Sequence, residues 1–118
     1  MYKKKYECII PKSRKGANAW EYGYYREKDM LTIEIPKYEI DQMFVRKEHD
    51  IYNESFIDAM YREFGLLIDI YEEETIPYDI LPKVIKFLKM NRDIYDFPSF
   101  EKALYIGLKY KTYVDCWF

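Results

Sequence analysis

Apolar and polar residues alternate along the first ten positions, and this alternation predicts a β-strand that ends at Pro11. The polar stretch KSRKGANA that follows predicts a loop. Residues 20–25 and 31–35 predict two strands of a hairpin that turns around residues 27–29. A further strand is expected over residues 38–47, so the first half of the chain is expected to be mostly β-structure.

Helical spacing replaces the alternation in the second half. Asn53 is the expected N-cap of a first helix over residues 54–64, and Gly65 suits its C-terminal end. Residues 66–71 then predict a buried or half-buried strand. The expected apolar stripe of the helix, spaced at i, i+3, i+4 and i+7, is Ile57, Met60, Tyr61 and Phe64.

Two more helices and a terminal strand are predicted beyond this point. The second helix is expected from Asp79, its N-cap, to about Arg92, and the third begins near Pro98. Their buried stripes are Leu81, Val84, Ile85 and Leu88, and Phe100, Ala103, Leu104, Gly107 and Leu108, where Gly107 is expected to allow close packing. The final strand places Val114, Cys116 and Phe118 inward and Tyr113, Asp115 and Trp117 outward.

These elements predict an α+β fold in one domain of 118 residues. The expected architecture is a mainly antiparallel sheet of about five strands with three helices packed on one face. A hydrophobic fraction of 49% with 34% charged residues is typical of an ordered globular chain, and no apolar run approaches the ~20 residues that span a bilayer. The first residues, MYKKKYECII, lack the apolar core of a signal peptide, so we expect a cytoplasmic protein.

Catalytic motifs are not found in this sequence. Its single histidine, His49, lies in RKEHD, and a nucleophile–base pair with Cys116 would depend on the fold bringing the two together. Cys8 and Cys116 are expected to be buried free thiols, close together if the terminal strands pair. We therefore expect no enzyme, no cofactor and no metal site. A hydrophobic pocket with convergent polar groups around His49 would instead favour a small enzyme or a regulatory subunit.

Acidic residues are concentrated in the stretch IDIYEEETIPYDIL, which begins at Ile68. Between Met60 and Asp79 there are six acids and one base, Arg62. Acids ahead of a helix complement its N-terminal dipole, but three consecutive glutamates exceed that need and repel one another. The excess is consistent with a solvated turn or with a surface for a basic partner, since complementary charge speeds association and selects partners.

Basic and aromatic residues are each consistent with more than one role. The N-terminal cluster Lys3, Lys4, Lys5, Lys12, Arg14 and Lys15 is typical of a solvated strand edge, or of a small nucleic-acid-associated module if Tyr2, Tyr6 and Trp20 stack on bases. A net charge of −2 argues against a general nucleic-acid binder. The 14 tyrosines are consistent with a tyrosine-rich core rim or with an interaction surface, including a homo-oligomeric one.

A family resemblance extends over residues 64–118, about half of the chain. The combination of FGLLIDIYEEETIPYDILPKVIKFL with FPSFEKALYIGLKYKTYVDCWF resembles immunity proteins of bacterial polymorphic-toxin and contact-dependent growth inhibition systems. The ending departs from the family pattern, because Gly107 stands where alanine is commoner and DCWF replaces a simpler DF.

The resemblance implies stoichiometric blockade of a cognate toxin in the cytoplasm, without a catalytic residue. Many such toxins are nucleases, whose substrate groove is basic, and an acidic inhibitor surface can occupy that groove. Tyrosines on either side of the acids would serve as aromatic anchors. The predicted partner-binding residues are Asp69, Tyr71, Glu72, Glu73, Glu74, Tyr78 and Asp79.

Overall fold

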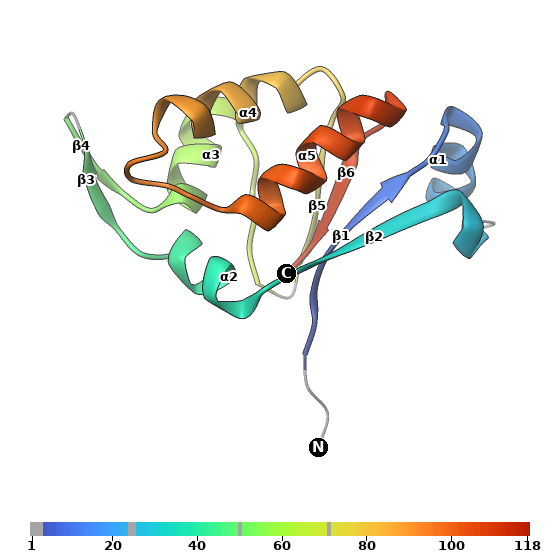
Figure 1. The fold of residues 1–118 in the computed structure, drawn as a ribbon, viewed down its shortest axis with the longest axis horizontal. Helices are drawn as coiled ribbons and strands as arrows, with labels where there is room; N and C mark the ends of the chain where they lie inside the picture. Colours follow the sequence, from blue (N-terminus) through green and yellow to red (C-terminus); the bar gives the residue numbers. More distant parts are fainter. Residues whose placement is uncertain (1–3, 24–25, 50, 71) are drawn as a thin grey trace.

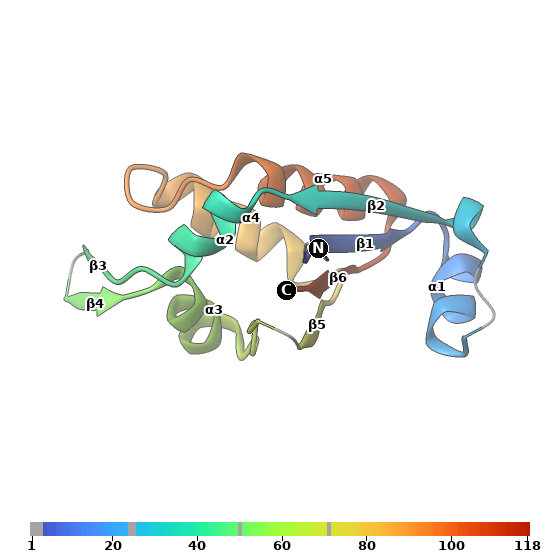
Figure 2. The same ribbon diagram turned by 90° about the horizontal axis from the view of Figure 1, so that it is seen from below.

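The centre of the fold is a four-stranded antiparallel sheet in the order β2-β1-β6-β5 (Figure 1). The computed structural model describes residues 4–23, 26–49, 51–70 and 72–118. A separate antiparallel pair, β3 with β4, lies at the opposite end of the molecule from α1 (Figures 1 and 2). The α+β fold with an antiparallel sheet is confirmed, whereas the single sheet of about five strands is wrong. The strands are β1 (Tyr6–Pro11), β2 (Met30–Ile35), β3 (Lys47–His49), β4 (Tyr52–Glu54), β5 (Glu73–Ile76) and β6 (Val114–Trp117).

Five α-helices, rather than the predicted three, form within the described residues. The long helix α5 packs against β1, β2 and β6, and α4 packs beside α5. The principal-axis extents of the molecule are 45 × 39 × 21 Å. The helices are α1 (Arg14–Glu21), α2 (Lys37–Met43), α3 (Phe56–Phe64), α4 (Leu81–Met90) and α5 (Pro98–Tyr110), with a 3₁₀ turn η1 (Glu27–Asp29).

The N-terminal half differs most from the prediction. KSRKGANA is not a loop, because Ser13 caps α1: its Oγ accepts a hydrogen bond from the Gly16 N–H at 2.9 Å. Trp20 therefore lies on a helix and not on a strand, and residues 24–25 lie outside the described part of the chain. The predicted hairpin around residues 27–29 does not form either, since β2 pairs with β1.

The strand predicted over residues 38–47 is mostly the helix α2. Ile40 and Met43 are buried at helical spacing in the main core. The fully buried Glu39 of the same helix caps α5, because its carboxylate accepts from the backbone N–H of Ser99 at 3.1 Å and of Phe100 at 3.2 Å. Tertiary contacts with α5 thus decide the conformation of this segment.

Residues 66–70 do not form the predicted strand, and Tyr71 lies outside the described residues. Leu66 and Ile68 are buried in alternation with the exposed Leu67, so the pattern is that of an extended segment. Its backbone is held by a side chain instead of a neighbouring strand: the Leu67 N–H donates to Glu74 at 2.7 Å. The paired strand is β5, a few residues later.

The later helices and the last strand follow the prediction closely, apart from their caps. Ser55, not Asn53, caps α3 by accepting from the Asp58 N–H at 3.1 Å, and Gly65 ends the helix in the left-handed region at a φ of 69°. Asp79 does not cap α4, whose N-cap position is Ile80. In α3 the buried face is turned slightly from the predicted stripe: Phe56, Ala59 and Met60 are buried and Tyr61 is exposed.

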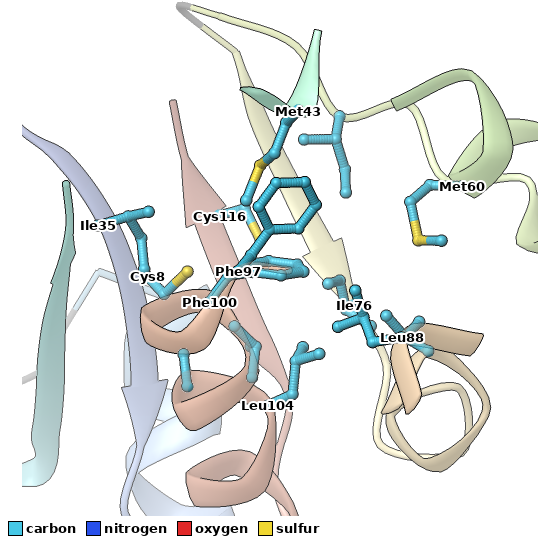
Figure 3. Packing of buried hydrophobic residues seen from close by; sticks show 14 of the residues in the cluster. Cys8, Ile35, Met43, Met60, Ile76, Leu88, Phe97, Phe100, Leu104 and Cys116 are labelled. Atoms are coloured by element: carbon cyan, nitrogen blue, oxygen red, sulfur yellow. The ribbon is translucent and has the colours of Figure 1, made fainter. Parts of the chain in front are cut away.

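The core lies between the sheet and the helices α2 to α5 (Figure 3). Cys8 lies opposite Cys116 across β1 and β6, and both are buried free thiols, as predicted. Gly107 brings α5 close to the sheet, because a Cβ there would lie 2.7 Å from Val114 Cγ2. The predicted inward residues Val114, Cys116 and Phe118 are all buried.

Candidate functional site

Three glutamates and a tryptophan form a row across the sheet on the face opposite α5. Cross-strand pairing joins Glu34 to Glu7, Glu7 to Trp117, and Trp117 to Glu73, so the row crosses β2, β1, β6 and β5 in turn. Directly paired residues share one face of a sheet, and like charges placed there repel. We call Glu34, Glu7, Trp117 and Glu73 the acidic row. Glu34, Trp117 and Glu73 are exposed, so a partner can reach them.

A buried carboxylate supports the row from two residues before Trp117 on β6, on the same face of the sheet. Asp115 is fully buried, although its position in the strand is the predicted outward one. Its carboxylate accepts from the indole N–H of Trp20 at 2.9 Å and of Trp117 at 3.0 Å, and from the Thr75 hydroxyl at 3.1 Å. Helix α1 carries Trp20 over this end of the sheet. Asp115 therefore fixes two indoles that belong to opposite ends of the chain.

The two indoles border a cavity of about 440 Å³ between α1 and the sheet. Their rings meet edge to face, with centroids 6.2 Å apart and an interplanar angle of 82°. Burial, together with the neighbouring Asp115 carboxylate, raises the pKa of Glu73, and burial raises the pKa of Tyr113. We call this the tryptophan cavity; it is lined by Trp20, Glu21, Glu73, Thr75, Tyr113 and Trp117.

A second hollow of about 390 Å³ adjoins the tryptophan cavity along α1. The two hollows share Glu21, Thr75 and Tyr113, and the second also reaches Tyr78. Its charge differs, because the basic Arg14 and Lys111 line it. The two hollows together form a groove that is acidic at the end near Trp117 and mixed in charge at the other end, where Glu21 lies with Arg14 and Lys111.

The predicted acidic segment is divided by the structure. Glu73 lines the tryptophan cavity and Tyr78 lines the second hollow. The Glu74 carboxylate instead accepts hydrogen bonds from the backbone N–H groups of Leu67 and Thr75, at 2.7 and 3.0 Å. The other predicted residues do not line either hollow among the described residues: Asp69 accepts from the Ile70 N–H at 2.7 Å, Glu72 and Asp79 are exposed, and Tyr71 is outside the described part.

Sequence reasoning missed Glu7, Glu34, Trp20 and Trp117 as members of one site. The available signal was the outward alternation of Glu7, Glu34 and Trp117 in three predicted strands. Alternation assigns each residue to a side of its own strand, and only the pairing register shows that the three residues are neighbours.

Another cavity, of about 430 Å³, lies beside His49 at the other end of the molecule. Its lining combines Phe87 with the cations Lys83 and Lys86. A pocket with apolar and charged groups therefore lies beside His49, as a small-molecule site there would require.

A partly buried ion pair borders the His49 cavity. Arg62 binds the Glu54 carboxylate through Nε at 3.0 Å and through Nη2, and this hydrogen bonding holds the pKa of Glu54 below its usual value. His49 Nε2 lies 3.3 Å from the same carboxylate. Tyr95 donates its hydroxyl to the Glu54 carbonyl at 2.7 Å, and burial raises the pKa of Tyr95 to about 12. Arg62 is thus shared between Glu54 and Glu63, which accepts from its Nη1 at 2.7 Å and also lines the cavity. Lys83 and Lys86 give the lining an excess of positive charge.

A Cys116–His49 pair does not form. Cys116 lies in the central sheet and His49 in the β3–β4 pair, which the two views place apart (Figures 1 and 2). The hydrogen bond to Cys8 and complete burial raise the pKa of the Cys116 thiol, which keeps it protonated and weakly nucleophilic.

Exposed tyrosines are distributed over several elements. Tyr95 is buried, and the exposed ones belong to α2, α3, α5, the end of α1 and the segment before α4. Part of the tyrosine excess therefore lies in the core and part on the surface. Among the described residues, the exposed tyrosines are Tyr22, Tyr38, Tyr61, Tyr78 and Tyr105.

Comparisons with known proteins give no further guide: no protein-family model, curated protein or solved structure matches this chain. Within the described residues, no group of three or more His, Cys, Asp or Glu side chains is placed to hold a metal ion. None of the described helices has the length and apolar character needed to cross a bilayer.

Proposed function

We propose that this chain is an immunity-type protein that binds the basic surface of a cognate bacterial toxin domain and blocks it stoichiometrically, without catalysing a reaction. The acidic row is the observation that carries the proposal. Its three glutamates occupy one sheet face together with an exposed tryptophan, the residue type that most often anchors a protein interface. The resemblance of residues 64–118 to immunity proteins supports the same function.

The electrostatics of the row favour a basic partner. Glu7 and Glu34 are a direct cross-strand pair of like charge, which weakens the isolated sheet. A cationic surface placed over them removes this repulsion and also accelerates encounter by long-range attraction. The groove of a nuclease toxin, which binds phosphates, provides such a surface.

Nucleic-acid binding through the N-terminal lysines fits the structure less well. Of the candidates for base stacking, Trp20 donates its indole N–H to Asp115, and its ring borders a cavity with Glu21 and Glu73. Phosphate groups are repelled by that environment. The basic residues Lys12, Arg14 and Lys15 lie at the start of α1 and remain exposed.

The test takes the C-terminal domain of the protein encoded directly upstream of the gene and expresses it with and without this chain. We expect the chain to restore growth and to form a one-to-one complex. The variant Glu7→Gln/Glu34→Gln/Glu73→Gln should associate at least tenfold more slowly at low salt, and its association rate should depend less on salt.

A matched control removes the same number of charges at exposed acids on other elements: Glu27→Gln/Glu48→Gln/Asp93→Asn. This control should retain fast association and full protection. Failure of the chain to bind or protect against the upstream domain would contradict the immunity function. Equal association rates for the two triple variants would contradict the role of the acidic row.

The His49 cavity favours a second candidate function, which is binding of a small anion with an apolar body. Lys83 and Lys86 supply charge beside the aromatic wall of Phe87. A suitable probe is anilinonaphthalene sulfonate, whose fluorescence rises on transfer to an apolar site. Saturable binding that is lost in Lys83→Glu/Lys86→Glu would support this candidate, and binding unchanged in that variant would contradict it.

A further inference from the structure

The walls of the tryptophan cavity are aromatic and its polar groups are mainly acidic. Trp20, Trp117 and Tyr113 form the aromatic surface, and Glu21 and Glu73 are exposed acids on the same lining. The lining formed by the described residues includes no lysine or arginine. Aromatic faces and carboxylates both attract cations, and they do so most strongly where water is partly excluded.

The cavity is already organised before any ligand enters. Asp115 accepts from both indole N–H groups and from the Thr75 hydroxyl, so it fixes the two rings in a perpendicular arrangement. The rings therefore need little reordering to receive a ligand, which reduces the entropic cost of binding.

Like charges lie close together in the tryptophan cavity. Glu73 lies beside the buried Asp115, and burial and this neighbouring carboxylate raise the pKa of Glu73. Ionised Glu73 is consequently held in an unfavourable environment. A positive charge between Glu73 and Glu21 would relieve that repulsion, whereas an anionic ligand would increase it.

The chemistry of the lining selects an organic cation. The described residues provide no three-ligand cluster for a metal ion, and a hard metal ion does not use indole walls. A guanidinium is planar, so it can stack on an indole face while its N–H groups reach a carboxylate. An ammonium group can use the same ring faces and acids with fewer donors.

We propose that the tryptophan cavity is the receptor for a single arginine or lysine side chain, with arginine preferred, presented by a basic protein partner. This inference deepens the proposed function, because it names the group of the partner that enters the acidic end of the groove. Trp20 and Trp117 supply the aromatic faces, and Glu73 and Glu21 supply the countercharge.

Intrinsic fluorescence reports directly on this site, because the chain has two tryptophans and both line the cavity. N-acetyl-arginine amide serves as the probe at low ionic strength, and N-acetyl-citrulline amide is its neutral counterpart of the same shape. We expect a saturable change in emission at millimolar concentrations of the arginine probe and none with the citrulline probe.

Two variants test whether the arginine probe binds in the tryptophan cavity. Glu73→Gln should weaken binding of the arginine probe about tenfold, the factor for losing one charge-assisted hydrogen bond. Glu72→Gln, the adjacent exposed acid outside the cavity lining, should leave binding unchanged. Thermal unfolding of both variants shows that each remains folded.

Equal binding of the two probes, no binding of the arginine probe, or equal affinity of Glu73→Gln and the wild type would each overturn the inference. These outcomes are distinct from those of the growth assay. Protection from the toxin that persists while the arginine probe fails to bind would leave the immunity function intact and remove only the receptor role of the cavity.

Discussion

Substitution of Gly107 by alanine tests the packing of α5 on the sheet. Alanine is favoured over glycine inside a helix by about 1 kcal/mol, so helix propensity alone predicts a more stable protein. The structure predicts the opposite. The new Cβ would lie 2.7 Å from Val114 Cγ2 and 2.9 Å from Leu81 Cδ1, well inside van der Waals contact.

Neither neighbour can move away easily. Val114 and Leu81 are fully buried, and the β-branched Val114 has a restricted χ1 angle. Overpacking of this kind costs about 1–3 kcal/mol, and two clashes place Gly107→Ala near the upper end. After the gain in propensity, we expect a net loss of about 1–2 kcal/mol.

Urea unfolding followed by tryptophan fluorescence measures this loss as a lower midpoint at an unchanged slope. A double-mutant cycle identifies its cause: Val114→Ala should destabilise the Gly107→Ala protein less than it destabilises the wild type. Gly65→Ala is the control, because a Cβ there meets open space and the cost comes from the left-handed backbone. In the matching cycle, Val114→Ala should destabilise the Gly65→Ala protein as much as it destabilises the wild type. A Gly107→Ala protein as stable as the wild type would refute the reasoning.

Four further changes have expected outcomes. Tyr95→Phe leaves the buried Glu54 carbonyl without its hydroxyl donor and should cost about 1–3 kcal/mol in urea unfolding. Glu54→Gln should be less stable than the wild type near neutral pH, and the difference should disappear on acidification: the lowered pKa of Glu54 beside Arg62 adds stability above its usual 4.5 that is lost as pH falls through the folded pKa. Glu73→Gln should have the opposite sign, since the raised pKa of Glu73 means that wild-type stability falls as pH rises above 4.5 through the folded pKa, and equilibrium unfolding across that window should show the variant without this fall. Glu39→Ala removes the acceptor for the first turn of α5, should cost about 2–3 kcal/mol, and should speed hydrogen exchange at the start of that helix.

The sequence was informative wherever a segment carries its own complete apolar pattern. The helix α4 is an example, because Leu81, Val84, Ile85 and Leu88 mark a full buried stripe, and all four are buried. The strand β6 likewise buries the three residues that alternation assigns to its inner face. In α4 the local period and the tertiary burial agree, and in β6 they agree for the inner face but not for Asp115, which is fully buried on the outer face.

Short segments were predicted wrongly because their conformation depends on distant partners. The helix α1 has eight residues and α2 has seven, too few for helical periodicity to be distinguished from alternation. Trp20 of α1 is held by Asp115, and Glu39 of α2 is held by the first turn of α5. These contacts join residues that are far apart in sequence, so a local pattern cannot reveal them.

The sequence by itself determined that acids are abundant near Glu73, that Trp117 points outward from its strand, and that the chain folds as an α+β domain. It also placed Glu7 and Glu34 in two other predicted strands. Only the tertiary structure decided that these four residues form one row and that Glu74 is occupied by backbone. The physical reason is that the two-residue period of a strand fixes the side of each residue, whereas its neighbours on that side depend on register between strands. In this protein that register joins the first strand to the last.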